Sequence, residues 1–247
     1  MATIKPFRDR VHAGKQLSLS LRNYGLDPGA IVLALPRGGV PIGFTVAHAL
    51  GLALDILLVR KLGMPGQEEY AIGAVASGGV RVLQRGVLEH TGVTPAKLEL
   101  LCAREFAEIE RRERRYRGRR PVPQLAERTV ILVDDGLATG STMRAAIAVT
   151  QAQAPARIVV AVPVGAADTC AALAPEVDEL ICLRCPHPFR AVSQWYRQFD
   201  QTTDDEVINL LVRGWHAQAV REHQASTNDE FNGGNVEISD RPGPATR

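Results

Sequence analysis

Short runs of aliphatic residues, most of them followed by a turn rich in glycine or proline, recur along the chain. They predict buried strands over residues 31–35, 54–59, 130–133, 157–162 and 179–183. Between them, apolar residues fall at helical spacing and predict helices over residues 42–50, 95–116, 143–149, 167–173 and 207–212. Continuous apolar strands that alternate with helices are typical of a parallel sheet covered on both faces. We therefore expect an α/β fold with a Rossmann-like parallel sheet flanked by helices.

Three regions depart from this alternation. Residues 1–30 predict a helix and a turn that pack against the sheet. Residues 71–76 and 80–83 flank Ser77-Gly78-Gly79 and predict a small β-hairpin. From about His216 the composition turns to glutamine, serine, asparagine, glycine and proline. We therefore expect one domain over residues 1–216 and a disordered polar tail over residues 217–247.

Composition and charge argue against several classes of function. The chain of 247 residues is 45% hydrophobic but only 5% aromatic, and its formal net charge is +2. Few aromatic residues and little net charge argue against a nucleic-acid partner. No apolar run is long enough to span a membrane, and the first residues lack the apolar core of a signal peptide. Four cysteines are too few for a disulfide scaffold, so we expect a cytoplasmic protein.

The most informative stretch follows the strand at 130–133 and reads Asp134-Asp135-Gly136-Leu137-Ala138-Thr139-Gly140-Ser141-Thr142. Open α/β sheets bind ligands at the carboxyl ends of their strands. A turn of small residues before a helix offers free N–H groups and the positive end of a helix dipole to an anion. The two acids suit hydroxyl groups or hydrated Mg²⁺ rather than the phosphate itself. The stretch predicts a ligand with a phosphate and a diol; the alternative is an ordinary acidic turn.

Two further stretches carry the same kind of chemistry. Pro36-Arg37-Gly38-Gly39 directly follows the strand at 31–35, where glycines permit close approach of a ligand and Arg37 adds a planar cation. Arg60 and Lys61 follow the strand predicted at 54–59 and could reach a polyphosphate. The glycines, proline and charged residues after them suggest a mobile flap that includes Glu68 and Glu69, although solvated surface explains these two acids equally well.

The acidic stretch resembles the phosphoribosyl-pyrophosphate (PRPP) signature of type I phosphoribosyltransferases, in which a hydrophobic strand and two acids precede a Thr-Gly-x-Thr turn. The run Leu35-Pro36-Arg37-Gly38-Gly39 resembles the pyrophosphate loop of the same family, which often contains a cis peptide bond, here Pro36–Arg37. The resemblance covers residues 7–213 and is closest to stand-alone bacterial domains, with Phe7-Arg8-Asp9-Arg10 and Ala191-Val192-Ser193-Gln194-Trp195-Tyr196 among the matching segments.

The resemblance implies a role for each stretch. Asp134 and Asp135 would hold the ribose hydroxyls, directly or through Mg²⁺, and the loop from Gly136 through Ala138 to Thr142 would bind the 5-phosphate. Pyrophosphate would be bound with Mg²⁺ by Arg37, Gly38, Gly39, Arg60 and Lys61. One position departs from hypoxanthine-guanine-type enzymes, because Ala138 stands where they carry a carboxylate general base. A base would therefore come from Glu68, Glu69 or the acceptor.

Other motifs leave alternatives open. Seven arginines crowd the segment from Arg111 to Arg120, but glutamates three or four positions away favour a salt-bridged, solvated helix face over a contact with nucleic acid or another subunit. Cys182, Cys185 and His187 could suggest zinc, yet a second ligand pair is missing, so we expect buried thiols on a strand. The segment 186–200 concentrates aromatic residues, which form either a wall of the acceptor pocket or the contacts that pack the last helix onto the domain.

These observations predict a Mg²⁺-dependent enzyme that transfers the phosphoribosyl group of PRPP to an unidentified base or other small nucleophile, and they are compatible with a homo-oligomer. The rival hypothesis is a regulator that senses PRPP without turnover. Hydrolysis of a phosphorylated sugar is a weaker third hypothesis, because no nucleophile–base pair is evident.

Overall fold

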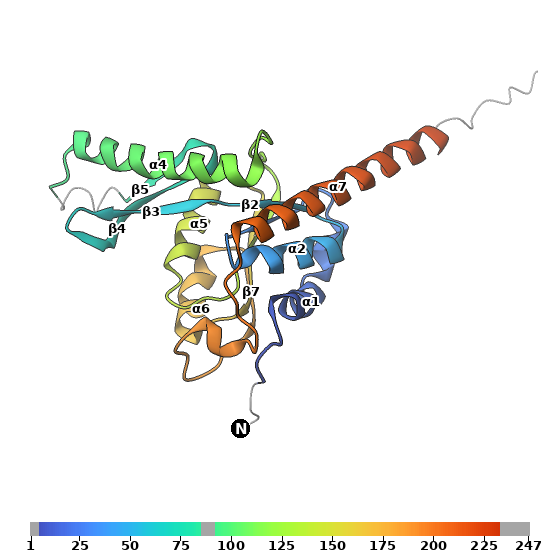
Figure 1. Ribbon diagram of the computed structural model, residues 1–247, viewed down its shortest axis with the longest axis horizontal. Helices are drawn as coiled ribbons and strands as arrows, with labels where there is room; N and C mark the ends of the chain where they lie inside the picture. Colours follow the sequence, from blue (N-terminus) through green and yellow to red (C-terminus); the bar gives the residue numbers. More distant parts are fainter. Residues whose placement is uncertain (1–4, 85–91, 233–247) are drawn as a thin grey trace, which may run out of the picture.

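The computed structural model describes residues 5–84 and 92–232 and contains two β-sheets (Figure 1). The larger sheet has five parallel strands in the order β2-β1-β6-β7-β8, which confirms the predicted parallel sheet. Its strands are β1 (Ile31–Ala34), β2 (Ala53–Ile56), β6 (Thr129–Val133), β7 (Arg157–Val164) and β8 (Glu179–Arg184).

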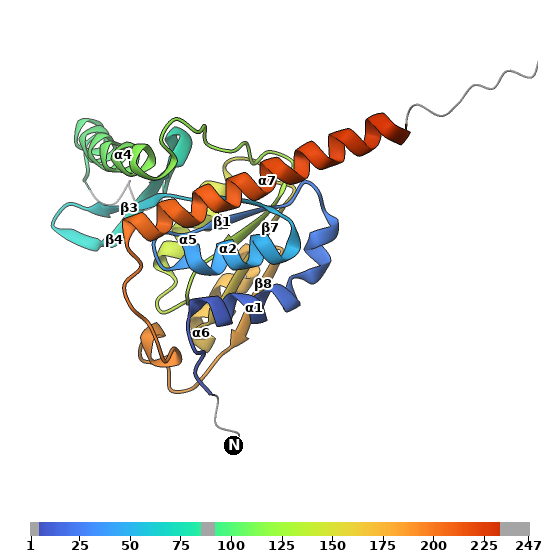
Figure 2. The ribbon, with the colours of Figure 1, turned by 45° about the vertical axis from the view of Figure 1, so that its right-hand side comes forward.

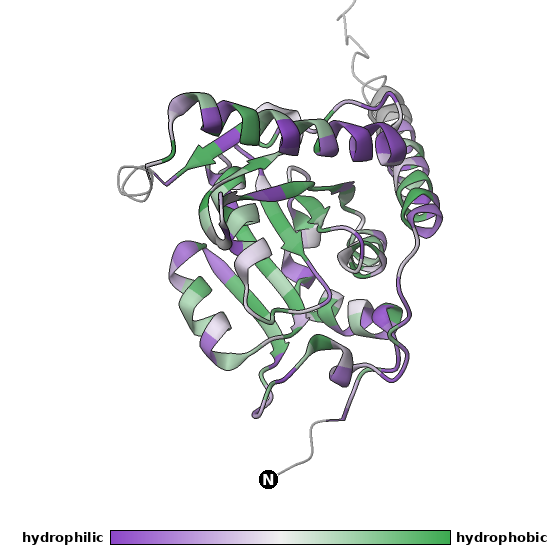
Figure 3. Cartoon of the chain, turned by 60° about the vertical axis from the view of Figure 1, so that its left-hand side comes forward, coloured by the Kyte–Doolittle hydropathy of each residue, from purple (hydrophilic) through white to green (hydrophobic). Residues whose placement is uncertain are grey.

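Helices cover both faces of this sheet, which explains why its strands are apolar without alternation (Figures 1 and 3). On β1, Val32 and Ala34 face a core cluster that also holds residues of α1, α2 and α7, whereas Ile31 and Leu33 face a second cluster with residues of α5 and α6. These helices are α1 (Arg10–Ser20), α2 (Gly39–Leu50), α5 (Ser141–Gln151), α6 (Ala167–Leu173) and α7 (Asp204–Asn232).

The register of the central strands brings two distant loops together. β1 and β6 pair in parallel from Ile31↔Val130 to Ala34↔Val133, so both strands end at the same level. The chain continues from these ends into residues 36–39 on one strand and 134–140 on the other. The two predicted ligand loops are therefore neighbours at the carboxyl edge of the sheet.

The single strand predicted over residues 54–59 is wrong. β2 ends at Ile56, where its pairing with β1 also ends, and a new strand, β3 (Val59–Met64), enters a second sheet. This sheet is antiparallel with the order β3-β4-β5 and includes β4 (Gln67–Ala76) and β5 (Val80–Leu83), which confirms the hairpin around Ser77-Gly78-Gly79. Arg60 and Lys61 therefore lie on β3 and not at a carboxyl end of the parallel sheet.

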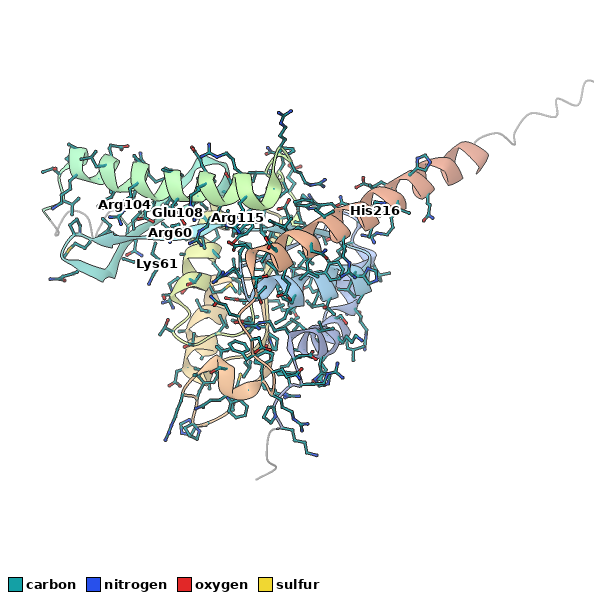
Figure 4. The ribbon with its side chains drawn as sticks, in the orientation of Figure 1. Arg60, Lys61, Arg104, Glu108, Arg115 and His216 are labelled. Carbon is teal, nitrogen blue, oxygen red and sulfur yellow. The ribbon has the colours of Figure 1, made fainter. Side chains whose placement is uncertain are left out.

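The long helix α4 (Pro95–Arg117) lies across the second sheet (Figures 1 and 4). A buried ion pair joins it to the first sheet. Thr94 caps its start, as its position before Pro95 predicts, by accepting a hydrogen bond from the N–H of Lys97. At its end, Nε of Arg117 lies 2.8 Å from Oδ1 of Asp55 on β2. The two side chains are 2% and 5% exposed, so this pair is part of the interior.

The last helix is much longer than the predicted segment at residues 207–212. α7 runs from Asp204 to Asn232, so the segment from 217 to 232, expected to be a disordered tail, is helical; residues 233–247 lie outside the described part. Its first part packs along β2, the edge strand, whereas its far end extends away from the rest of the domain (Figures 1 and 2). Trp215 Nε1 donates to the Leu54 carbonyl at 3.0 Å, and Arg221 donates to the Leu52 carbonyl at 3.2 Å. Among the described residues, no helix has the length and apolar character needed to cross a bilayer.

Candidate functional site

The acid pair lies where β6 ends, between the sheet and the loop that follows β1. Oδ1 of Asp134 accepts a hydrogen bond from the N–H of Asp135 at 2.8 Å. Burial and the neighbouring Asp135 carboxylate raise the pKa of Asp134 well above its ordinary value. Burial also raises the pKa of Asp135, although Arg10 opposes this shift. Two adjacent acids in this environment gain from a ligand that stabilises their charge.

Asp135 is held from two sides by segments far away in the sequence. Arg10, at the start of α1, donates to Oδ2 of Asp135 from Nη2 at 2.9 Å and from Nε at 3.1 Å. The hydroxyl of Tyr196 donates to the backbone carbonyl of Asp135 at 2.7 Å. The Arg10 guanidinium also lies 3.9 Å from the ring centroid of Phe199. The acid pair is therefore oriented by both ends of the domain.

The loop after β1 approaches the acid pair more closely than any side chain would permit. A Cβ on Gly38 would lie 2.0 Å from Oδ2 of Asp135, and a Cβ on Gly39 would lie 2.6 Å from the Val133 carbonyl. Glycine is therefore required at both positions for steric reasons. The Pro36–Arg37 peptide bond is cis, as the family resemblance implies.

The loop from Gly136 to Gly140, where the sequence predicts an anion site, ends at the start of α5. Gly140 adopts a φ of 70°, and the N-terminus of α5 has no side-chain cap. The first N–H groups of that helix are thus available to a ligand. Thr139 Oγ1 lies 3.2 Å from Ser141 Oγ, and Thr142 is exposed in the same first turn. These donors sit together next to the acids, as the sequence predicts.

Thr169, on α6, contacts this loop through a hydrogen bond. Its Oγ1 donates to the Ala138 carbonyl at 2.6 Å. A Cβ on Gly140 would lie 2.6 Å from the Thr169 methyl group, so the left-handed glycine and the threonine fit one another. Sequence reasoning missed Thr169, because nothing near it in the chain indicates a contact with the loop.

Arg60 and Lys61, which were expected to act together, contact different parts of the structure. Lys61 Nζ lies 3.4 Å from Ser141 Oγ and so extends toward the anion loop. Arg60 instead pairs with Glu105 on α4, with Nε 2.6 Å from Oε2 (Figure 4). Adjacent residues on a strand point to opposite faces, which explains the divergence. Glu68 and Glu69, the acids of the predicted flap, belong to β4, and their side chains lie outside the described part of the structure.

Arg37 turns away from the acid pair toward α4 and α7. Its Nη1 lies 3.7 Å from Oδ1 of Asp204, which also accepts the Tyr116 hydroxyl at 2.5 Å. Burial and Asp204 together raise the pKa of Tyr116 to about 12. A cavity of about 290 Å³ lies here, lined by Pro36, Arg37, Arg111, Arg112, Arg115, Tyr116 and Asp204. Arginines of α4 therefore meet the residue expected to bind pyrophosphate.

The remaining sequence motifs have different outcomes. Glu108 binds Arg111 and Arg112 on the helix surface, as predicted, while Arg117 is buried instead. The aromatic segment packs on the N-terminal residues, with the Tyr196 and Phe7 rings 5.6 Å apart. The thiols were expected to be buried on a strand, and this is wrong for Cys185, which is exposed because β8 ends at Arg184.

Comparison with known proteins gives a consistent result. The family model of the phosphoribosyl transferase domain matches residues 12–198. A Mycobacterium tuberculosis protein named "Putative phosphoribosyl transferase" is 44% identical over 211 residues, which cover 85% of this chain and 47% of that protein. The chain thus spans about half the length of the curated relatives that it matches. The crystal structure of TT1426 from Thermus thermophilus has 41% identity and a TM-score of 0.77, covering 84% of this chain and 98% of that one.

Proposed function

Since the chain belongs to the phosphoribosyl transferase domain family, we propose that it binds PRPP and transfers the phosphoribosyl group to a nucleobase or related acceptor, with release of pyrophosphate. The observation that carries the proposal is the meeting of two loops, in which Gly38 packs against Asp135 beside the anion site at Gly140. One molecule with a diol, a phosphate and a pyrophosphate would use all of these groups.

In this proposal the 5-phosphate lies at the start of α5. The free N–H groups of the first helical turn would bind its oxygens, together with the hydroxyls of Thr139 and Ser141. Lys61 would contribute a positive charge, because its ammonium group is already directed at Ser141. Gly136, Ala138 and Thr142 would shape the rest of this pocket.

Asp134 and Asp135 would hold the two ribose hydroxyls. Arg10 orients the carboxylate of Asp135, whereas no cationic side chain in the described part of the chain forms an ion pair with Asp134. Carboxylate oxygens are the ligands that Mg²⁺ prefers, and the pair would hold the ion directly or through water. Bound Mg²⁺ would neutralise negative charge on the departing pyrophosphate.

The pyrophosphate would lie at the Pro36–Gly39 loop, where Gly38 is half-buried and has no side chain to hinder a ligand. The arginine-lined cavity beside Arg37 offers further positive charge at the same loop. Charge on the leaving group grows as the bond to the ribose carbon breaks, so fixed cations here would stabilise the transition state. In this proposal Arg37 binds pyrophosphate, as the family resemblance implies, together with Arg112 and Arg115.

Calorimetry with PRPP and Mg²⁺ tests binding, and a pyrophosphate-release assay across nucleobases tests transfer. We expect Asp134→Asn and Asp135→Asn to weaken PRPP binding by at least about tenfold, or 1.4 kcal/mol. The matched control is Glu110→Gln, which removes an exposed carboxylate on α4 and should leave binding unchanged. Absence of PRPP binding by the unmodified protein would refute the proposal.

The second candidate is a PRPP-sensing regulator without turnover. It is favoured by one observation, the pairing of Arg37 with Asp204 instead of an orientation toward the acid pair. Tight PRPP binding with no pyrophosphate release for any acceptor would support the sensor. Release with any acceptor, lost in Asp134→Asn, would support the enzyme.

A further inference from the structure

Three of the four cysteines gather beneath the anion loop. Cys170 comes from α6, Cys182 from β8 and Cys185 from the turn after β8, and their Sγ atoms all lie within 4.8 Å of one another. All three are free thiols. The spacing of cysteines in the sequence does not reveal this cluster, because Cys170 lies near Cys182 and Cys185 only through the packing of α6 on β8.

Packing alone does not explain this cluster. Cys170 is buried and Cys182 half-buried, but Cys185 is exposed and contributes nothing to the core. The sulfurs pack directly against Gly165, since a Cβ there would lie 2.7 Å from Sγ of Cys170 and 3.3 Å from Sγ of Cys182. A side chain at this position would therefore displace the two thiols.

The three sulfurs match the requirements of a thiophilic cation. A metal–sulfur distance of about 2.3 Å places the sulfurs of a tetrahedral or trigonal site about 3.8–4.0 Å apart. The observed cluster therefore needs to contract by roughly 1 Å at most, which side-chain rotation can supply.

We propose that Cys170, Cys182 and Cys185 form a three-thiolate site for a thiophilic cation, Zn²⁺ or Cu⁺. Soft sulfur donors select these ions over Mg²⁺, which keeps this site distinct from the acid pair. Binding replaces each S–H bond with a sulfur–metal bond and releases the thiol protons to solvent, with no change of oxidation state.

The site would also support the anion loop. Thr169 precedes Cys170 on α6 and donates to the Ala138 carbonyl at 2.6 Å. A cation shared by Cys170 and Cys182 would therefore fix α6, and with it this contact, against β8. The inference does not depend on PRPP chemistry and can fail or succeed independently of it.

The test is a metal titration of the reduced, metal-stripped full chain. Zn²⁺ is added in competition with a chromophoric chelator, and Cu⁺ is added anaerobically with a Cu⁺ chelator, so that the affinity for each ion is measured separately. We expect one equivalent bound, with proton release measured by calorimetry in two buffers. Loss of a ligand in Cys185→Ala should weaken binding by more than the roughly 10–100-fold typical of outer partners.

Cys102→Ala is the matched control, because Cys102 is the fourth cysteine and lies on α4 outside the cluster. It should bind metal like the unmodified chain. Cys185→Ala changes an exposed residue, so circular dichroism should show an intact fold. Equal metal affinity of Cys185→Ala and the unmodified chain would overturn the proposal. So would a reduced protein that binds neither ion. Formation of a disulfide between two of the thiols in air would not rescue the proposal in that case.

Discussion

Two aspartate–arginine pairs lie at the carboxyl ends of strands of the same sheet, Asp55–Arg117 at β2 and Asp135–Arg10 after β6. The Arg117 guanidinium also donates to the Ile56 carbonyl, to Ser77 and to Glu113, so its donors are used within the protein. Asp135 lies beside a second acid, Asp134, whose pKa is raised well above its ordinary value by burial and by Asp135. In the first pair, the positive charge of Arg117 is matched by partners within the protein. At the second pair, Arg10 is a single cation beside two acids, Asp134 and Asp135.

This difference separates a pair with a structural role from a pair that we propose binds a ligand. A buried pair whose partners are all supplied by the chain fixes α4 to the sheet and offers nothing to a ligand. The Asp135–Arg10 pair lies beside a second carboxylate, that of Asp134. This group of charges gains stability when a ligand supplies hydroxyls or a metal ion. The most informative experiments therefore alter one pair and compare the result with the other.

The largest expected effect is on the closed pair. Arg117→Met leaves Asp55 buried without its cation and should lower the free energy of unfolding by about 3–5 kcal/mol, measured by urea denaturation. Arg111→Met is the control, because Arg111 pairs with Glu108 at the surface, where water screens the pair, and its loss should leave the free energy of unfolding nearly unchanged. Equal losses in the two variants would show that the pair does not anchor α4.

The open pair should respond less in stability and more in binding. Arg10→Gln removes two donors to Asp135, and we expect a loss of about 1–3 kcal/mol in unfolding free energy. PRPP binding, measured by calorimetry, should weaken because Asp135 is no longer oriented. An unchanged PRPP affinity in a folded Arg10→Gln protein would contradict this positioning role.

The acid pair also predicts a dependence of stability on pH. The pKa of Asp134 is raised in the folded state, so its contribution is fully present below the unfolded value of about 3.9 and is lost as pH rises through the folded value. A carboxyl whose pKa is one unit higher in the folded state than in the unfolded state costs about 1.4 kcal/mol once it is ionised. Asp134→Asn should therefore be more stable than the unmodified chain at pH 7, and denaturation across pH should show the gap closing in acid.

The smallest effect is expected at Glu108, on the solvated face of α4. Hydrogen bonds from Arg111 and Arg112 lower its pKa to about 2, so its contribution is present above about pH 4 and is lost in acid, the opposite direction to Asp134. Because the residue is exposed to screening by water, Glu108→Gln should cost less than about 1 kcal/mol at pH 7. A larger loss in urea denaturation would mean that this surface network is coupled to the core.

The central strands could be predicted because burial on both faces leaves a continuous apolar run, as in residues 31–35 and 130–133. The acids, glycines and hydroxyls that follow them lie where strand ends place ligands. The change of sheet after Ile56 could not be predicted, because apolar residues continue to Val59 and the pattern does not say with which sheet they pair.

The missing parts of the site and the last helix depend on contacts between distant residues. Arg10 meets Asp135 across 125 positions, and Trp215 reaches Leu54 across 161. Local composition at Arg10 and Tyr196 gives no sign of these partners; only the family resemblance of the segments around them marked the regions. For the same reason, polar residues beyond His216 suggested disorder, although the helix continues to Asn232 and Arg221 still donates to the Leu52 carbonyl.

The matched register of β1 and β6 has an evolutionary consequence. Backbone hydrogen bonds set the spacing of the two ligand loops, and the whole of residues 57–128 is inserted between the strands that carry them. Such an insertion can be exchanged without moving either loop, provided that the new segment supplies counterparts to Arg117, the partner of Asp55, and to Lys61, whose Nζ lies 3.4 Å from Ser141 Oγ. A chimera that exchanges this segment with a relative should therefore keep the anion site while changing the molecules that can approach it.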